Sequence, residues 1–116
     1  MDPASSIDRE LAVAEKAWLN GNQGKARVCA RRAVAIAVEA WLARHPRAPW
    51  HGDAMAYLRD IQLERSFPLY VRQAAERLTT SVPRRDSLPF TSDPIGDARV
   101  ILTHLTSHAQ DKTDLT

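Results

Sequence analysis

The stretch AVAIAVEAWLA, from Ala33 to Ala43, decides the fold because it carries a single charged residue, Glu39. A helix of this composition has no polar side to present to water, so it must be surrounded by protein. It lies within a longer helix-forming segment, about residues 23 to 44, whose many alanines allow a neighbouring helix to approach closely. We therefore expect this helix at the centre of the molecule, covered by its own bundle on one side and by a second copy of the chain on the other.

Helical periodicity and helix-ending residues recur along the rest of the chain. Ser5 or Ser6 is the expected cap of a first helix over residues 6 to 20, which the Gly/Asn-rich turn at 20–24 ends. A short helix is expected over 52–63, a fourth from Pro68 with an apolar stripe that reaches Val82, and a fifth from Pro94 to about residue 108. The inward positions predicted for the last three helices are Met55, Leu58, Ile61, Val71, Ala74, Ala75, Leu78, Ile95, Ala98, Ile101, Leu102 and Leu105.

These segments indicate an all-α fold, since no alternating run of β-branched residues competes with them. We expect an up-and-down antiparallel bundle of four to five helices in one domain over residues 1–116, with a core of about 6–108 and a tail over 109–116. The first two helices also bear a faint likeness to one tetratricopeptide unit. One such unit cannot bury its own faces, and nothing further along the chain repeats it.

Composition sets broad limits on function. The chain of 116 residues has a formal net charge of +2 and one cysteine, Cys29, which excludes an intrachain disulfide. The sequence has no apolar run of membrane-spanning length and no leader-like N-terminus, so a cytoplasmic protein with no membrane partner is expected. Residues 23–50 contain six basic side chains and one acidic side chain, which gives this segment a mild excess of positive charge.

The first two helices resemble the HEPN family, whose members are small helical bundles and commonly dimers. Non-nuclease members often show Gln-x-Ala-x-Glu-x-x-Leu-Lys in the second helix, and residues 35–43 match its alanine, glutamate and leucine but not its glutamine and lysine. His51 lies where such members often have a histidine that opens the third helix. DPIGDARVILTHL, residues 93–105, is similar to their closing helix with its Asp97-Ala98 pair. The resemblance implies a non-enzymatic, dimeric interaction or nucleotide-binding module, with a nucleotidyltransferase as a partner.

HEPN ribonucleases carry Arg-x4-6-His, and Arg99 with His104 fits that spacing. The alternative function is therefore a metal-independent, toxin-like endoribonuclease in which His104 moves a proton and Arg99 stabilises phosphate charge. Five residues of helix leave the two side chains about 140° apart, so one helix does not easily aim both at one phosphate. Val100 also stands where nuclease members have a polar residue, and we favour the non-enzymatic reading.

Other candidate residues follow from charge and from the resemblance. We expect Glu39 to be desolvated and to meet an arginine from the fourth helix or a partner chain, with a ligand contact as the second choice. His104 and His108 lie one turn apart but lack a third ligand, so neither a metal nor another cofactor is predicted. A helical scaffold without any ligand is the remaining possibility. The predicted ligand-binding residues for a nucleotide or RNA are Arg31, Glu39, His51, Arg84 and Arg85, and Arg27, Arg44 and Arg47 are further candidates for an anion site.

Overall fold

A computed structural model describes residues 2–80 and 93–114 of the chain, with side chains up to residue 107. Within these ranges the chain forms five α-helices and no strand, which confirms the predicted all-α bundle. The helices are α1 (Pro3–Leu19), α2 (Gln23–Arg44), α3 (Ala54–Leu63), α4 (Leu69–Thr79) and α5 (Pro94–Asp114). No helix of the described residues is long and apolar enough to cross a membrane.

The helix ends follow local side-chain chemistry. Asp2 caps α1 by accepting a hydrogen bond from the Ser5 backbone N–H at 3.1 Å, and Pro3 occupies the first helical position. The predicted cap at Ser5 or Ser6 is therefore wrong, because the Asp-Pro pair starts the helix one turn earlier. The α1–α2 turn contains Gly21 at φ +80, a backbone conformation that glycine adopts at low cost.

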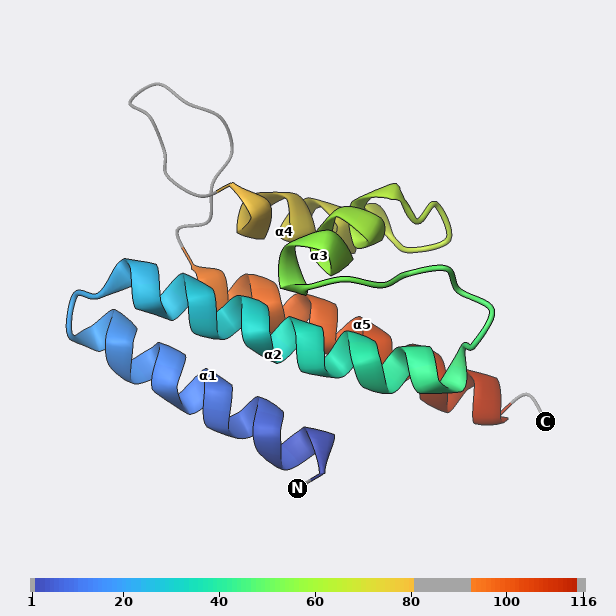
Figure 1. The fold of residues 1–116 in the computed structure, drawn as a ribbon, viewed down its shortest axis with the longest axis horizontal. Coiled ribbons are helices and arrows are strands. Elements are labelled where there is room, and N and C mark those ends of the chain that lie inside the picture. Colours follow the sequence, from blue (N-terminus) through green and yellow to red (C-terminus); the bar gives the residue numbers. More distant parts are fainter. Residues whose placement is uncertain (1, 81–92, 115–116) are drawn as a thin grey trace.

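The helices are arranged as a long layer and a short hairpin (Figure 1). α1 packs extensively and antiparallel against α2, and α5 lies on another side of α2 and runs in the same direction as α2. α5 can run parallel to α2 because the segment between them brings the chain back to the end of the molecule where α2 starts. This segment contains α3 and α4, which form an antiparallel hairpin across α2 and α5. As a result, the C-terminal end of α4 lies near the starts of α2 and α5.

α2 is covered on three sides within a single chain. Val34 and Val38 are completely buried, and the neighbouring elements are α1, α3 and α5. The prediction that α2 lies centrally is thus confirmed. One side remains uncovered in the single chain, and we call it the outer stripe of α2. Its residues, all exposed or half-buried, are Val28, Arg32, Ala35, Ile36, Glu39 and Ala43.

The predicted inward residues of the other helices form the core. Leu58, Ile61, Val71, Leu78 and Ile101 are fully buried, and Ala74, Ala75, Ala98 and Leu105 lie beside them. Met55, Ile95 and Leu102 are half-buried and pack against this core. Val82, predicted to extend the stripe of the fourth helix, lies outside the described residues.

Candidate functional site: an aromatic and basic hollow

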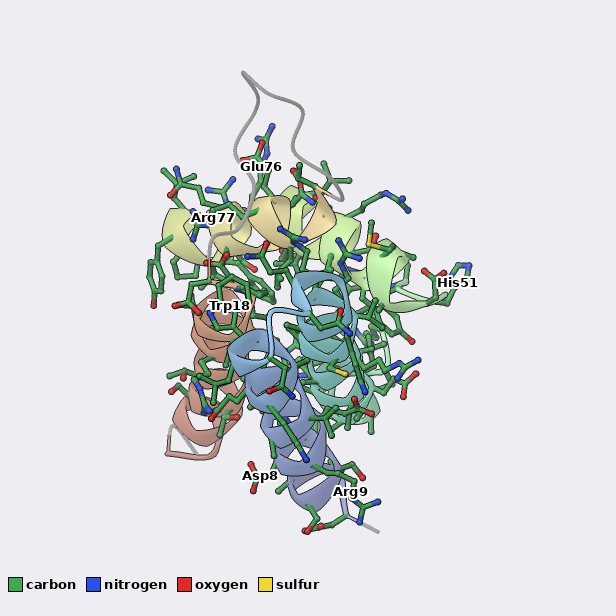
Figure 2. The ribbon with its side chains drawn as sticks, turned by 90° about the vertical axis from the view of Figure 1, so that its left-hand side faces the viewer. Asp8, Arg9, Trp18, His51, Glu76 and Arg77 are labelled. Atoms are coloured by element: carbon green, nitrogen blue, oxygen red, sulfur yellow. The ribbon has the colours of Figure 1, made fainter. Side chains whose placement is uncertain are left out.

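The predicted ligand-binding residues do not meet in one place. Arg31 lies against the C-terminal end of α4, Glu39 lies beside α3, and His51 is exposed in the segment before α3. Figure 2 shows His51 projecting from the edge of the molecule. Its ring Nδ1 donates to the Pro49 carbonyl at 3.1 Å, a local bond within the loop. Arg84 and Arg85 lie outside the described residues.

Glu39 is exposed rather than desolvated. Its Oε2 accepts a hydrogen bond of 3.4 Å from the Tyr57 hydroxyl of α3. The expected arginine from the fourth helix is therefore wrong for the single chain, since Arg72 donates to the Phe67 carbonyl and Arg77 pairs with Asp97. The carboxylate acts in turn on Tyr57: burial first, and then the nearby Glu39 charge, raises the pKa of the tyrosine.

Arg31 has a structural partner. Its Nε donates to the Leu78 carbonyl at 2.7 Å and so satisfies one of the free carbonyls at the end of α4. Burial, together with the neighbouring Arg27 charge, lowers the pKa of Arg31. Arg27 is itself buried, which the sequence did not suggest, and its Nε has no hydrogen-bond partner among the described residues.

Arg99 and His104 face different neighbours on the two flanks of α5. Arg99 pairs with Glu15 of α1 at 2.7 Å and lines a hollow of about 370 Å³ between α1 and α5. His104 is half-buried, and its ring packs edge-on against Phe67, with centroids 4.6 Å apart. Within one chain the structure does not bring this pair to a common point.

A different set of residues converges at the C-terminal end of α2. A hollow of about 540 Å³ opens there, between the segment that follows α2 and the α3–α4 turn. Its lining includes three aromatic rings, two arginines and one carboxylate. They are Trp41, His45, Phe67, Arg44, Arg47 and Glu64. We call this feature the aromatic hollow.

The rings of the aromatic hollow are held by local hydrogen bonds. His45 ends α2, one helical turn after Trp41, and its Nδ1 donates to the Trp41 carbonyl at 2.9 Å. This bond places the imidazole flat on the indole, with centroids 4.2 Å apart and planes at 17°. Trp50 also packs on Trp41 at 4.8 Å, and Phe67 meets Trp41 edge-on at 5.8 Å.

The opposite wall is fixed by the turn between α3 and α4. Glu64 accepts from the Ser66 hydroxyl at 2.8 Å, and Arg72 donates to the Phe67 carbonyl at 3.1 Å. These contacts set the position of Phe67, which is buried. The wall is thus fixed before any ligand arrives, and a fixed wall lowers the entropy lost on binding.

Charge in the aromatic hollow comes mainly from its arginines. Arg44 and Arg47 are exposed, and neither forms an ion pair with another described residue. Two guanidinium groups beside an aromatic floor suit an anionic group attached to a planar ring, because arginine binds phosphate or carboxylate through paired N–H donors. The sequence singled out both arginines but not the aromatic floor, whose rings come from segments up to 26 residues apart along the chain.

Other reactive groups fit structural roles. Cys29 is buried, as predicted, and burial is the main cause that raises the pKa of its thiol, so it stays protonated near neutral pH. Among the described side chains, no group of three or more His, Cys, Asp or Glu residues is placed to hold a metal ion. Of the two histidines one turn apart that lack a third ligand in the sequence, His104 is described and the side chain of His108 lies outside the described side chains.

Comparison with known proteins adds no relative: no family model, no curated protein and no solved structure matches this chain.

Proposed function

We propose that the chain is a non-enzymatic binding module for a nucleotide-class ligand, a planar heteroaromatic ring that carries phosphate. The observation that carries this proposal is that aromatic rings and two arginines without ion-pair partners line the same hollow. The volume, about 540 Å³, falls within the range of about 300–1,000 Å³ that is typical of small-molecule sites.

Each part of such a ligand has a counterpart in the aromatic hollow. Any base can stack on an aromatic side chain, since every base has a flat π-face, and the half-buried ring of His45 is the candidate here. A phosphate gains charge-assisted hydrogen bonds from Arg44 and Arg47. Glu64 is an acceptor for amino or hydroxyl groups on the remaining edge of the ligand.

The HEPN resemblance stays a prediction, and so do the nucleotidyltransferase partner and the cytoplasmic location that go with it. A nucleotide-binding module suits such a partner because the two proteins would handle the same class of molecule. The ribonuclease alternative gains no support from the single chain, in which Arg99 is engaged by Glu15 and His104 by Phe67.

Titration with AMP and ATP, followed by intrinsic fluorescence, tests the proposal directly. Trp41 and Trp50 belong to the ring cluster, so a bound base is expected to change tryptophan emission. We expect saturable binding with a Kd below about 1 mM for the nucleotides. Adenosine, which lacks phosphate, and inorganic pyrophosphate, which lacks the ring, are each expected to bind at least about tenfold more weakly, because each loses one class of contact.

Two exposed arginines allow substitutions that leave the fold intact. Arg44→Gln and Arg47→Gln are each expected to weaken nucleotide binding about tenfold, a typical loss for one charge-assisted contact. Arg59→Gln on the exposed side of α3 is the matched control and should leave the affinity unchanged. An absence of saturation with any nucleotide, or equal affinities for all three variants, would refute the assignment of this site.

A further inference from the structure

The outer stripe of α2 has charges in a pattern that matches itself. Arg32 and Glu39 lie seven residues apart, so they point in nearly the same direction from the helix axis. Both are exposed, and neither forms an ion pair with another described residue. Between them lie Ala35 and Ile36, which are half-buried and uncharged.

A two-fold axis midway between Ala35 and Ile36 would pair this stripe with a second copy of itself. In two antiparallel α2 helices related by that axis, Arg32 stands level with Glu39 of the other copy, twice over. Val28 then stands level with Ala43, and Ala35 with Ile36. All six residues fall within an arc of about 100° around the helix, the width of one contact face.

From this register we infer that the outer stripe binds a second copy of the chain, with two Arg32–Glu39 ion pairs around a centre of Ala35 and Ile36. At the centre, the small Ala35 of each copy leaves room for Ile36 of the other copy to pack. Val28, a large apolar residue left 42% exposed in the single chain, becomes covered at each end. An isologous contact of this kind closes on itself and gives a dimer.

One oxygen of Glu39 already has a hydrogen-bond partner within the chain. The Tyr57 hydroxyl donates to Oε2 from the α3 side, and no described residue donates to Oε1. The tyrosine restricts the carboxylate, so less side-chain entropy is lost when the second copy's arginine binds. The aromatic hollow is formed by Trp41 and His45 on another face of α2, so the dimer and the ligand site are independent proposals.

Sedimentation equilibrium of the full chain, with charge reversals, tests the pairing. The wild-type chain is expected to be a dimer at micromolar concentration. Arg32→Glu and Glu39→Arg each place like charges opposite each other twice, and each is expected to weaken dimerisation by at least about tenfold. The double variant Arg32→Glu/Glu39→Arg restores both pairs with reversed polarity and is expected to recover most of the lost affinity.

Glu76→Arg is the matched control, since Glu76 is an exposed residue of α4 on a different side of the molecule (Figure 2). It should leave the dimer unchanged, and far-UV circular dichroism should show native helix content in every variant. A monomeric wild-type chain, or a double variant that dimerises no better than the two single variants, would overturn the proposed interface and its register.

Discussion

Two ion pairs of the structure differ in their exposure to solvent: Arg77 with Asp97 is partly buried, and Arg99 with Glu15 is exposed. Arg77 Nη2 lies 2.8 Å from Asp97 Oδ1, and its Nε also donates to the carboxylate, which raises the pKa of the arginine. The Asp97 side chain is only 11% exposed, whereas both partners of the Arg99–Glu15 pair are more than half exposed. Removal of the arginine from the first pair is therefore expected to lower the stability of the fold more, because a partly buried carboxylate is left without its cation.

We expect Arg77→Met to lower the free energy of unfolding by about 2 kcal/mol, a value between those of exposed and fully buried pairs. Arg99→Met, the matched control, is expected to cost about 0.5 kcal/mol or less. Urea denaturation of both variants measures the difference. Equal losses would show that burial of Asp97 adds nothing to the strength of the pair.

At the scale of secondary-structure elements, the start of α3 depends on one side chain. Asp53 Oδ1 accepts a hydrogen bond from the Ala56 backbone N–H at 3.0 Å. α3 has only ten residues, so the loss of this cap affects a large part of the helix. Asp53→Ala is expected to lower the free energy of unfolding by about 1 kcal/mol, whereas Asp53→Asn keeps the acceptor and should cost a few tenths at most. Thermal unfolding followed by circular dichroism separates the two variants, and similar melting temperatures for both would argue against the cap.

The sequence also predicts most of the helix boundaries. The α2 bounds agree with the expected 23–44, and Asp93 and Pro94 start α5 as predicted. The expected start at residue 52 was too early for α3, because Gly52 has φ +125 and Asp53 is the cap. α5 continues past its expected end at residue 108, since the residues of the expected tail contain no proline or glycine to stop it.

Across the molecule, the sequence predicts which residues form the core but not which polar groups contact one another. Apolar periodicity identifies buried faces, because burial of a face depends on its own residues. The bond from Arg31 to the Leu78 carbonyl joins positions 47 residues apart, and the Arg99–Glu15 pair joins positions 84 residues apart. Such pairings depend on how the helices are placed relative to one another, which no local pattern specifies. The aromatic hollow was missed for the same reason.

The close packing of α1 on α2 makes a prediction for the molecule as a whole. Ala14 is completely buried, and so are Ala26 and Ala30 of α2, which indicates that the two helices approach closely because their facing side chains are small. Ala14→Leu adds volume where the core is already filled, so it is expected to lower the free energy of unfolding by about 1–3 kcal/mol. Ala12 lies on the exposed side of the same helix, and Ala12→Leu makes the same chemical change with no packing cost.

Chemical denaturation of the two leucine variants compares them at equal helix propensity, since alanine and leucine are both strong helix formers. We expect the Ala12 variant to stay within about 0.5 kcal/mol of the wild-type chain and the Ala14 variant to unfold at lower denaturant concentration. Equal stability of the two variants would mean that α1 can move away from α2 without loss. In that case small side chains between the two helices would not explain how α2 comes to be covered.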